Sequence, residues 1–216
     1  MDCVGWGDIA YAHRMVVKRK LGETPADAPA RGRRGGSLRI VDFLGLVDEG
    51  VRSRLSRKAA TRPTNRTQSK SRTSGGAEAL RVLAPVPEYS GWETRQRFGY
   101  VQYWRDEHGR GNPCLHYEVW VQRKTKRLEI GLHFEGDREW SYACAALLAE
   151  HATEVAAAIG TEWELEEWTA SWTRLHRAFA APVLSAELAD EAAERVVGLM
   201  RGMEPLLVTW GLRGSG

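Results

Sequence analysis

Two neighbouring segments of the chain alternate apolar and polar residues so regularly that they constrain the fold more than any other feature. Residues 115–122 and 127–135 each place every second side chain on one face, which is the period of a half-buried β-strand. Residues 123–126 between them form a polar turn. A hairpin loop of two or four residues puts every apolar residue opposite another apolar residue on one face. The predicted pairs are Val121 with Leu128, Val119 with Ile130, Tyr117 with Leu132 and Leu115 with Phe134.

The same register gathers four ionisable side chains on the polar face of this hairpin. His116 lies directly opposite His133, a position at which Cβ atoms are about 4.5–5.5 Å apart. Glu118 and Glu135 are polar neighbours on the two strands, and Gly131 is expected to leave the centre of the patch open. Imidazole nitrogens and carboxylate oxygens suit Zn, Mn or Fe, and the same groups can act as acid and base. A structural His–Glu network or a solvated outer face explains the pattern more simply.

Further elements predict an α+β fold: an antiparallel meander packed against an Ala-rich helix, a further strand and C-terminal helices. Residues 171–180 fit either a helical stripe or a strand. Two further strands are predicted, over 97–104 and over Thr161 to Trp168. A helix capped by Asp137 or Ser141 is expected to run to Ile159, with Gly160 as a left-handed cap. A last helix begins at Ser185 and is followed by a short further turn at Pro205.

The charge of the chain changes sign at Gly75-Gly76. Residues 1–76 hold 16 Lys and Arg against 7 Asp and Glu, a formal charge of +9, whereas residues 77–216 hold 15 against 21, a charge of −6. Residues 50–77 contain no acidic residue and little that is apolar, so we predict that they do not form a core. The sequence therefore predicts a basic, mostly disordered leader over 1–76 and a single α+β domain over 77–216, with only a weak short helix between Ser37 and Leu55.

Three interpretations of this leader remain open. Its spaced cations can neutralise phosphates, which makes nucleic acid a possible partner. The basic run contains no aromatic residue on which a base could stack, which favours a solvated linker instead. The leader is also what an over-extended translation start in GC-rich DNA produces.

Catalytic motifs are absent from the sequence. His133-Phe134-Glu135 has the H-x-E form of zinc deaminases, but no P-C-x-x-C follows it, and there is no phosphate loop, G-x-S-x-G or H-E-x-x-H. We therefore expect a non-catalytic protein-binding or regulatory module, with Trp120 and Trp168 on polar faces as candidate interface anchors. The alternative is a metal-dependent hydrolase or nuclease that uses the polar face of the 115–135 hairpin. For the favoured interpretation we predict no metal and no cofactor.

The environment of the protein is predicted from its cysteines and its hydropathy. The three cysteines Cys3, Cys114 and Cys144 are scattered without C-x-x-C spacing, which favours a reducing compartment and argues against a disulfide framework. No run approaches the roughly 18 apolar residues that a membrane helix needs, and the first residues lack the pattern of a signal peptide. We expect a cytoplasmic protein that does not bind membranes and has protein as its main partner.

Overall fold

A computed structural model describes residues 19–20, 37–56, 91–105 and 114–213 of the chain. In this part the elements form an α+β fold with one antiparallel sheet of order β1-β6-β7-β5-β4-β3-β2. The elements are β1 (Arg19–Lys20), α1 (Ile40–Ser56), β2 (Trp92–Gln96), β3 (Tyr100–Arg105), β4 (Leu115–Gln122), β5 (Arg127–Phe134), α2 (Arg138–Glu150), α3 (Ala152–Ile159), β6 (Glu164–Glu167), β7 (Thr173–Ala180) and α4 (Ala186–Thr209).

The hairpin of β4 and β5 has the predicted register. Val119 lies opposite Ile130, Tyr117 opposite Leu132, and the polar pair His116 and His133 lie opposite each other. β3 pairs with the other side of β4, which completes the predicted meander. Register is strongly specified here because a slip of one residue would move the apolar side chains out of the core.

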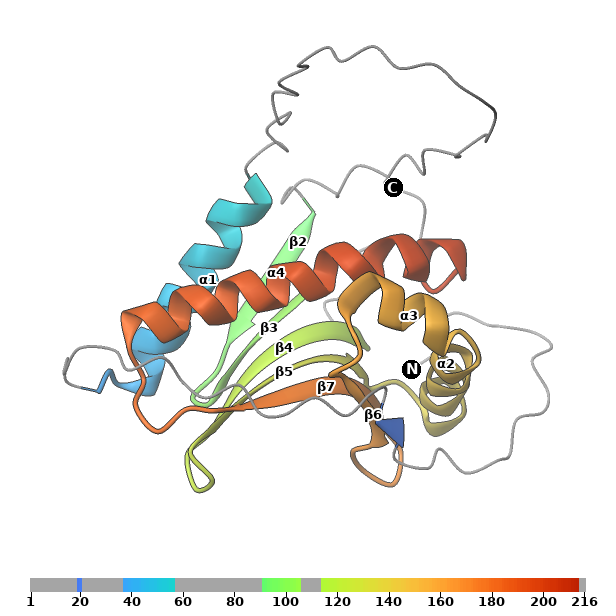
Figure 1. Ribbon diagram of the computed structural model, residues 1–216, viewed down its shortest axis with the longest axis horizontal. Coiled ribbons are helices and arrows are strands. Elements are labelled where there is room, and N and C mark those ends of the chain that lie inside the picture. The colour runs from blue at the N-terminus through green and yellow to red at the C-terminus, as the bar shows by residue number, and fades with distance from the viewer. Residues whose placement is uncertain (1–18, 21–36, 57–90, 106–113, 214–216) are drawn as a thin grey trace, which may run out of the picture.

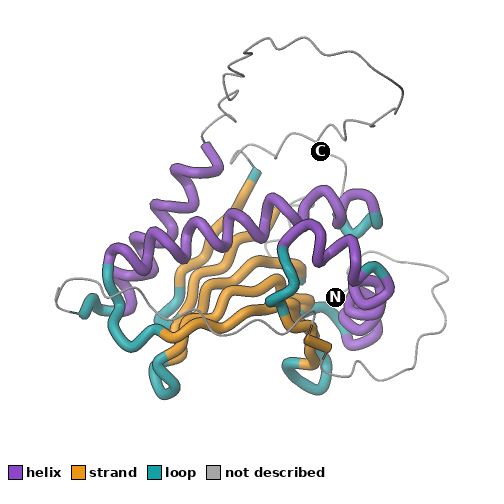
Figure 2. The backbone as a smooth tube through the Cα atoms, in the orientation of Figure 1, coloured by secondary structure: helices purple, strands orange, loops and turns teal. Residues whose placement is uncertain are grey.

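The apolar face of the sheet is covered by helices, with α4 crossing the strands (Figure 1). α1 packs against the N-terminal half of α4 and α3 against its C-terminal half. Two glycines allow these close approaches: a Cβ at Gly50 would lie 2.8 Å from the Cβ of Ala193, and one at Gly202 would lie 2.4 Å from Cγ2 of Ile159. Figure 2 shows the resulting layer of helices over the strands. No helix in the described ranges is long and apolar enough to cross a membrane.

α1 corrects the prediction that the leader contributes no core. Phe43, Leu44, Val47 and Val51 are completely buried, because α1 presents one apolar stripe to α4 and the sheet. Residues 40–56 of the predicted leader therefore belong to the same hydrophobic core as the strands. The boundary predicted at residue 76 and the basic run after Ser56 lie outside the described residues.

Several other elements differ from the sequence-based prediction. Residues 173–180 form a strand, because β5 and β6 pair with its two sides. β2 was not predicted, and β6 is shorter than the strand expected over 161–168. The predicted single helix from Asp137, which does cap it, is broken at His151 into α2 and α3. Pro205 lies within α4, which runs on to Thr209.

Candidate metal centre

The face of the sheet away from the helices carries a buried layer of polar and charged side chains. Ten of them form what we call the polar network: Arg95, Gln102, His116, Glu118, Glu129, His133, Glu135, Glu166, Arg174 and His176. Strand alternation places nine of them on this face, and Glu135 follows directly after β5. His116 and His133 are 0% and 1% exposed, so this is not the solvated outer face expected of an antiparallel sheet.

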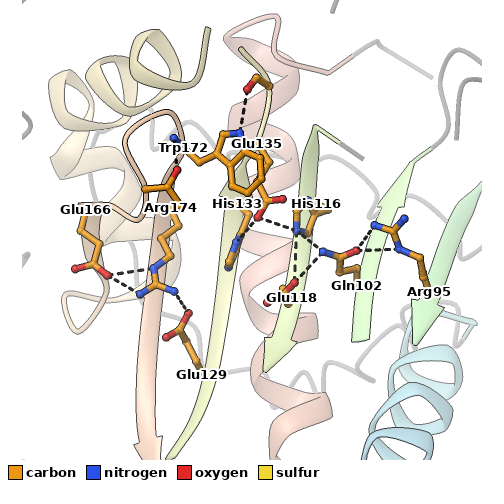
Figure 3. A network of polar contacts seen from close by, with 12 residues as sticks. Arg95, Gln102, His116, Glu118, Glu129, His133, Glu135, Glu166, Trp172 and Arg174 are labelled. Carbon is orange, nitrogen blue, oxygen red and sulfur yellow. Dashed lines mark hydrogen bonds and ion pairs between the residues drawn. The ribbon is translucent and has the colours of Figure 1, made fainter. Parts of the chain in front are cut away.

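One side of the polar network is organised by Gln102 (Figure 3). Arg95 donates to Oε1 of Gln102 through Nη2 at 2.6 Å and Nε at 3.2 Å, which fixes the orientation of the amide. The amide nitrogen then donates to Oε2 of Glu118 at 2.8 Å and lies 3.0 Å from Nε2 of His116. His116 therefore accepts at Nε2, and this lone pair points into the network.

His116, His133 and Glu135 bring their donor atoms within 4.8 Å of one another. Oε1 of Glu135 lies 3.2 Å from Nδ1 of His133 and 3.8 Å from Nε2 of His116. The two imidazole rings have centroids 5.1 Å apart and are tilted by 30°. All three lie on the same side of the sheet, which makes them a candidate ligand set for one ion.

Burial sets the protonation of this group. Desolvation lowers the pKa of His133 to about 3, so that its ring is neutral at physiological pH. Burial also raises the pKa of the Glu135 carboxyl, and the nearby His116 and Arg95 counteract only part of this shift. The neutral imidazole of His133 has a lone pair to offer a metal ion, whereas the raised pKa means that the Glu135 carboxyl gives up a proton less readily and must be ionised to act as a ligand.

Glu118, the fourth residue predicted for this site, lies close to the group but outside it. Its Oε2 is 3.8 Å from Nε2 of His116 and is held by Gln102. The space over Gly131 is not open as predicted. A Cβ at Gly131 would lie 3.0 Å from Nε2 of His133 and 3.1 Å from Cβ of His176, so the ring of His133 fills the space that the glycine leaves.

The second side of the polar network surrounds Arg174. Its guanidinium donates to Glu129 through Nη1 and to Oε1 of Glu166 through Nη2 at 2.6 Å. Nε2 of His176 lies 3.0 Å from the same Glu166 oxygen, without hydrogen-bond geometry. Glu164, Glu166 and His176 form another set of clustered donors, but Arg174 already neutralises Glu166. This side was not predicted from the sequence, because residues 171–180 fit either a helix or a strand.

The tryptophans predicted as interface anchors lie over the polar network. The indole of Trp168 contacts the ring of His133 edge-on at 4.9 Å, and the guanidinium of Arg174 lies 5.1 Å from its centroid. Trp120 lies 6.3 Å from Trp168, centroid to centroid, and both are half-buried. Trp168 covers the network through its contacts with His133 and Arg174, and Trp120 lies next to it. Their role in binding a partner stays a prediction.

Comparisons with known proteins do not identify a relative. No family model matches the chain, and neither a curated protein nor a solved structure shows significant similarity to it.

Proposed function

We propose that the domain is a non-catalytic regulatory module that binds one divalent transition-metal ion, such as Zn²⁺, through His116, His133 and Glu135. The observation that carries this proposal is the convergence of three buried donor atoms within 4.8 Å. Two imidazoles and a carboxylate are a common ligand set for such ions.

The distances between donors are close to those of a bound ion. Tetrahedral coordination at about 2.1 Å requires donors about 3.4 Å apart. The two separations that involve Glu135 are 3.2 and 3.8 Å. Binding requires two local changes. Nε2 of His116 must exchange its contact with Gln102 for the ion, and the hydrogen bond between Nδ1 of His133 and Oε1 of Glu135 must be replaced by bonds to the ion. The amide of Gln102 keeps its hydrogen bond to Glu118 when this happens.

The charge of the polar network also favours a cation. With its imidazoles counted as neutral, the network holds four carboxylates and two guanidiniums, a formal charge of −2. The carboxylates are those of Glu118, Glu129, Glu135 and Glu166. Buried charge without a counter-charge is costly, and a divalent ion balances this sum.

Burial favours a regulatory rather than a catalytic role. Both His side chains are at most 1% exposed and Glu135 is 17% exposed, so a substrate has little access to the ion. Metal binding would fix the face on which Trp168 and Trp120 pack, and would thereby control the protein contact predicted at these residues.

A metal-dependent hydrolase is a second candidate because of Glu118. Three protein ligands leave a fourth position for water, as in catalytic zinc sites. If an ion were bound, Glu118 would be the candidate general base, because its Oε2 lies 3.8 Å from the proposed ligand atom of His116.

Metal analysis of the full-length protein tests the proposal. We expect about one Zn, Mn or Fe per chain, and a rise in melting temperature on adding Zn²⁺ to chelated protein, since an ion at 100 times its Kd stabilises by about 2.7 kcal/mol. His133→Gln should abolish both effects. The matched control is His151→Gln, because His151 is partly exposed and pairs with Glu154 away from the network. The proposal would be contradicted if the purified protein contained no metal and its melting temperature did not rise on adding Zn²⁺, Mn²⁺ or Fe²⁺.

The metal-loaded protein also distinguishes the two roles. If the protein is a hydrolase, it should cleave p-nitrophenyl acetate or bis-p-nitrophenyl phosphate, and Glu118→Gln should lose this activity while keeping the ion. Metal-loaded protein that is inactive on both probes would leave the regulatory role alone.

A further inference from the structure

The tips of two adjacent hairpins form a second feature, far from the polar network. The turn between β2 and β3 at residues 97–99 lies beside the turn between β4 and β5 at residues 123–126, and the backbone N–H of Val121 donates to the carbonyl of Gly99 at 2.8 Å. The β4–β5 turn extends past the end of the sheet, below the layer of helices in Figure 1. We call the exposed side chains here the tip patch: Arg97, Phe98, Arg123, Lys124, Lys126 and Arg127.

The tip patch concentrates positive charge. Its five cations are exposed, and none of them forms an ion pair with a carboxylate of the described residues. The sequences of the two turns, 97–100 and 122–127, contain no acidic residue. The cluster is opposite in sign to the rest of this part of the chain, since residues 77–216 as a whole carry a formal charge of −6.

An aromatic ring lies among these cations. Phe98 is 77% exposed, the most exposed of the large apolar residues in the described part of the chain. The guanidinium of Arg123 lies 5.5 Å from the ring centroid, so it covers one face of the ring and leaves the other available. The basic run 52–72 of the leader contains no aromatic residue, so it lacks the stacking surface that Phe98 gives the tip patch.

We propose that the tip patch binds single-stranded nucleic acid, with a base stacked on Phe98 and the neighbouring phosphates on the Arg and Lys side chains. Stacking on an aromatic side chain together with phosphate neutralisation is the usual way in which proteins hold single strands without sequence preference. A lipid surface fits less well, because one ring that already carries a guanidinium offers little apolar surface to insert.

This site is separate from the proposed metal centre. His116 lies six residues along β4 from Gln122, which is about 20 Å at the rise of a β-strand. Nucleic-acid binding by the tip patch therefore does not require metal, and a failure of either proposal leaves the other standing.

Fluorescence anisotropy of the full chain with labelled dT20 and U20 tests the inference, at salt concentrations between 50 and 200 mM. Phe98→Ala should weaken binding about tenfold, the scale of one lost base stack, without changing the salt dependence. Arg123→Ser with Lys124→Ser should lower the slope of log K against log salt by about 1.4, since each phosphate contact to a single strand contributes about 0.7.

Matched variants control for composition and folding. Val183→Ala removes apolar surface at another exposed residue, and Arg39→Ser with Arg138→Ser removes two exposed cations elsewhere; both should bind as the original chain does. Circular dichroism checks that all variants fold. The inference is overturned if the tip variants bind oligonucleotide unchanged, which would place binding in the leader. It is equally overturned if the chain binds phosphatidylserine vesicles through Phe98 and does not bind either oligonucleotide.

Discussion

The two faces of the sheet are built from the same strands and are both buried, yet one is apolar and the other is charged. Along β5, Ile130 and Leu132 face the helices, whereas Glu129 and His133 face the other side, and all four are at most 2% exposed. Burial of a large apolar side chain stabilises a fold by about 1.5–3 kcal/mol. Burial of a charged one costs free energy unless it is paired.

The difference shows what each face requires from its surroundings. The apolar face needs only apolar contact, which α1, α2 and α4 provide. It contains few ionisable groups; one is Tyr117, whose hydroxyl donates to Glu204 at 2.8 Å and whose pKa is raised mainly by burial. The polar face needs a partner for each charge, and its surplus of carboxylates suggests that a cation is one of these partners.

The largest effect should follow from a charge on the apolar face. Ile130→Asp should leave the chain unfolded at 25 °C, because an unpaired carboxylate among apolar side chains costs several kcal/mol. Far-UV circular dichroism and urea titration measure this loss. Ile130→Val is the conservative control and should cost about 0.5–1.5 kcal/mol. A folded Ile130→Asp protein would show that the two faces do not differ as described.

On the polar face, the loss of one partner should be nearly as damaging. Arg174→Met leaves the carboxylate of Glu129 buried without its guanidinium, which should cost about 3–5 kcal/mol in urea denaturation. Alternation alone suggests that Glu129→Lys is tolerated, since Glu129 faces away from the helices. Its 2% exposure and its pairing with Arg174 lead us to expect severe destabilisation instead.

A double variant shows whether unpaired charge is the cause. Adding Glu129→Gln to Arg174→Met removes the stranded carboxylate and should recover part of the lost stability. Equal stability of the single and double variants would mean that lost packing, rather than charge, dominates on this face.

α1 tests how far the apolar face extends. Leu44→Ala should cost about 2–5 kcal/mol, the usual cost of a cavity at a fully buried leucine. Leu46, on the same helix, is 37% exposed, so Leu46→Ala should cost far less. Similar melting temperatures for the two variants would show that α1 adds little to the core, as expected of the mostly disordered leader predicted over residues 1–76.

Alternation made the hairpin predictable in detail, because the two strands contain every residue that sets the register. The same register placed His116 opposite His133 and identified Glu118 and Glu135 as their neighbours. The prediction was weaker where an element depends on contacts distant in sequence. Residues 173–180 became a strand by pairing with β5 and β6, and this pairing brings Arg174 and His176 to the polar face.

The role of α1 could not be read from composition either. Glycine lowers helix propensity, so Gly50 suggested a weak helix. In the structure the missing side chain of Gly50 allows close packing against Ala193 of α4, a gain that only tertiary contact reveals. Burial of the polar face was unpredictable for a similar reason, since alternation assigns a residue to a face and does not say what covers it.

The smallest predicted effect is a dependence of stability on pH that separates two neighbours on the polar face. In the native, metal-free chain the pKa of His133 is about 3, whereas it is 6.5 when unperturbed. Between these values the unfolded chain binds a proton that the native chain does not, so stability should fall as pH is lowered from 6.5. His133→Gln should make this loss of stability on acidification shallower in urea titrations at pH 7, 6 and 5 with a chelator present.

Glu135 should act in the opposite direction. Its pKa is raised, so the native carboxyl binds a proton at a higher pH than the unfolded one does, and this opposes the loss of stability. Glu135→Gln should therefore make the acid loss steeper, while His151→Gln should leave it unchanged. Equal slopes for the His133 and Glu135 variants would show that neither group is desolvated as its burial indicates, and the polar face would then resemble an ordinary solvated surface.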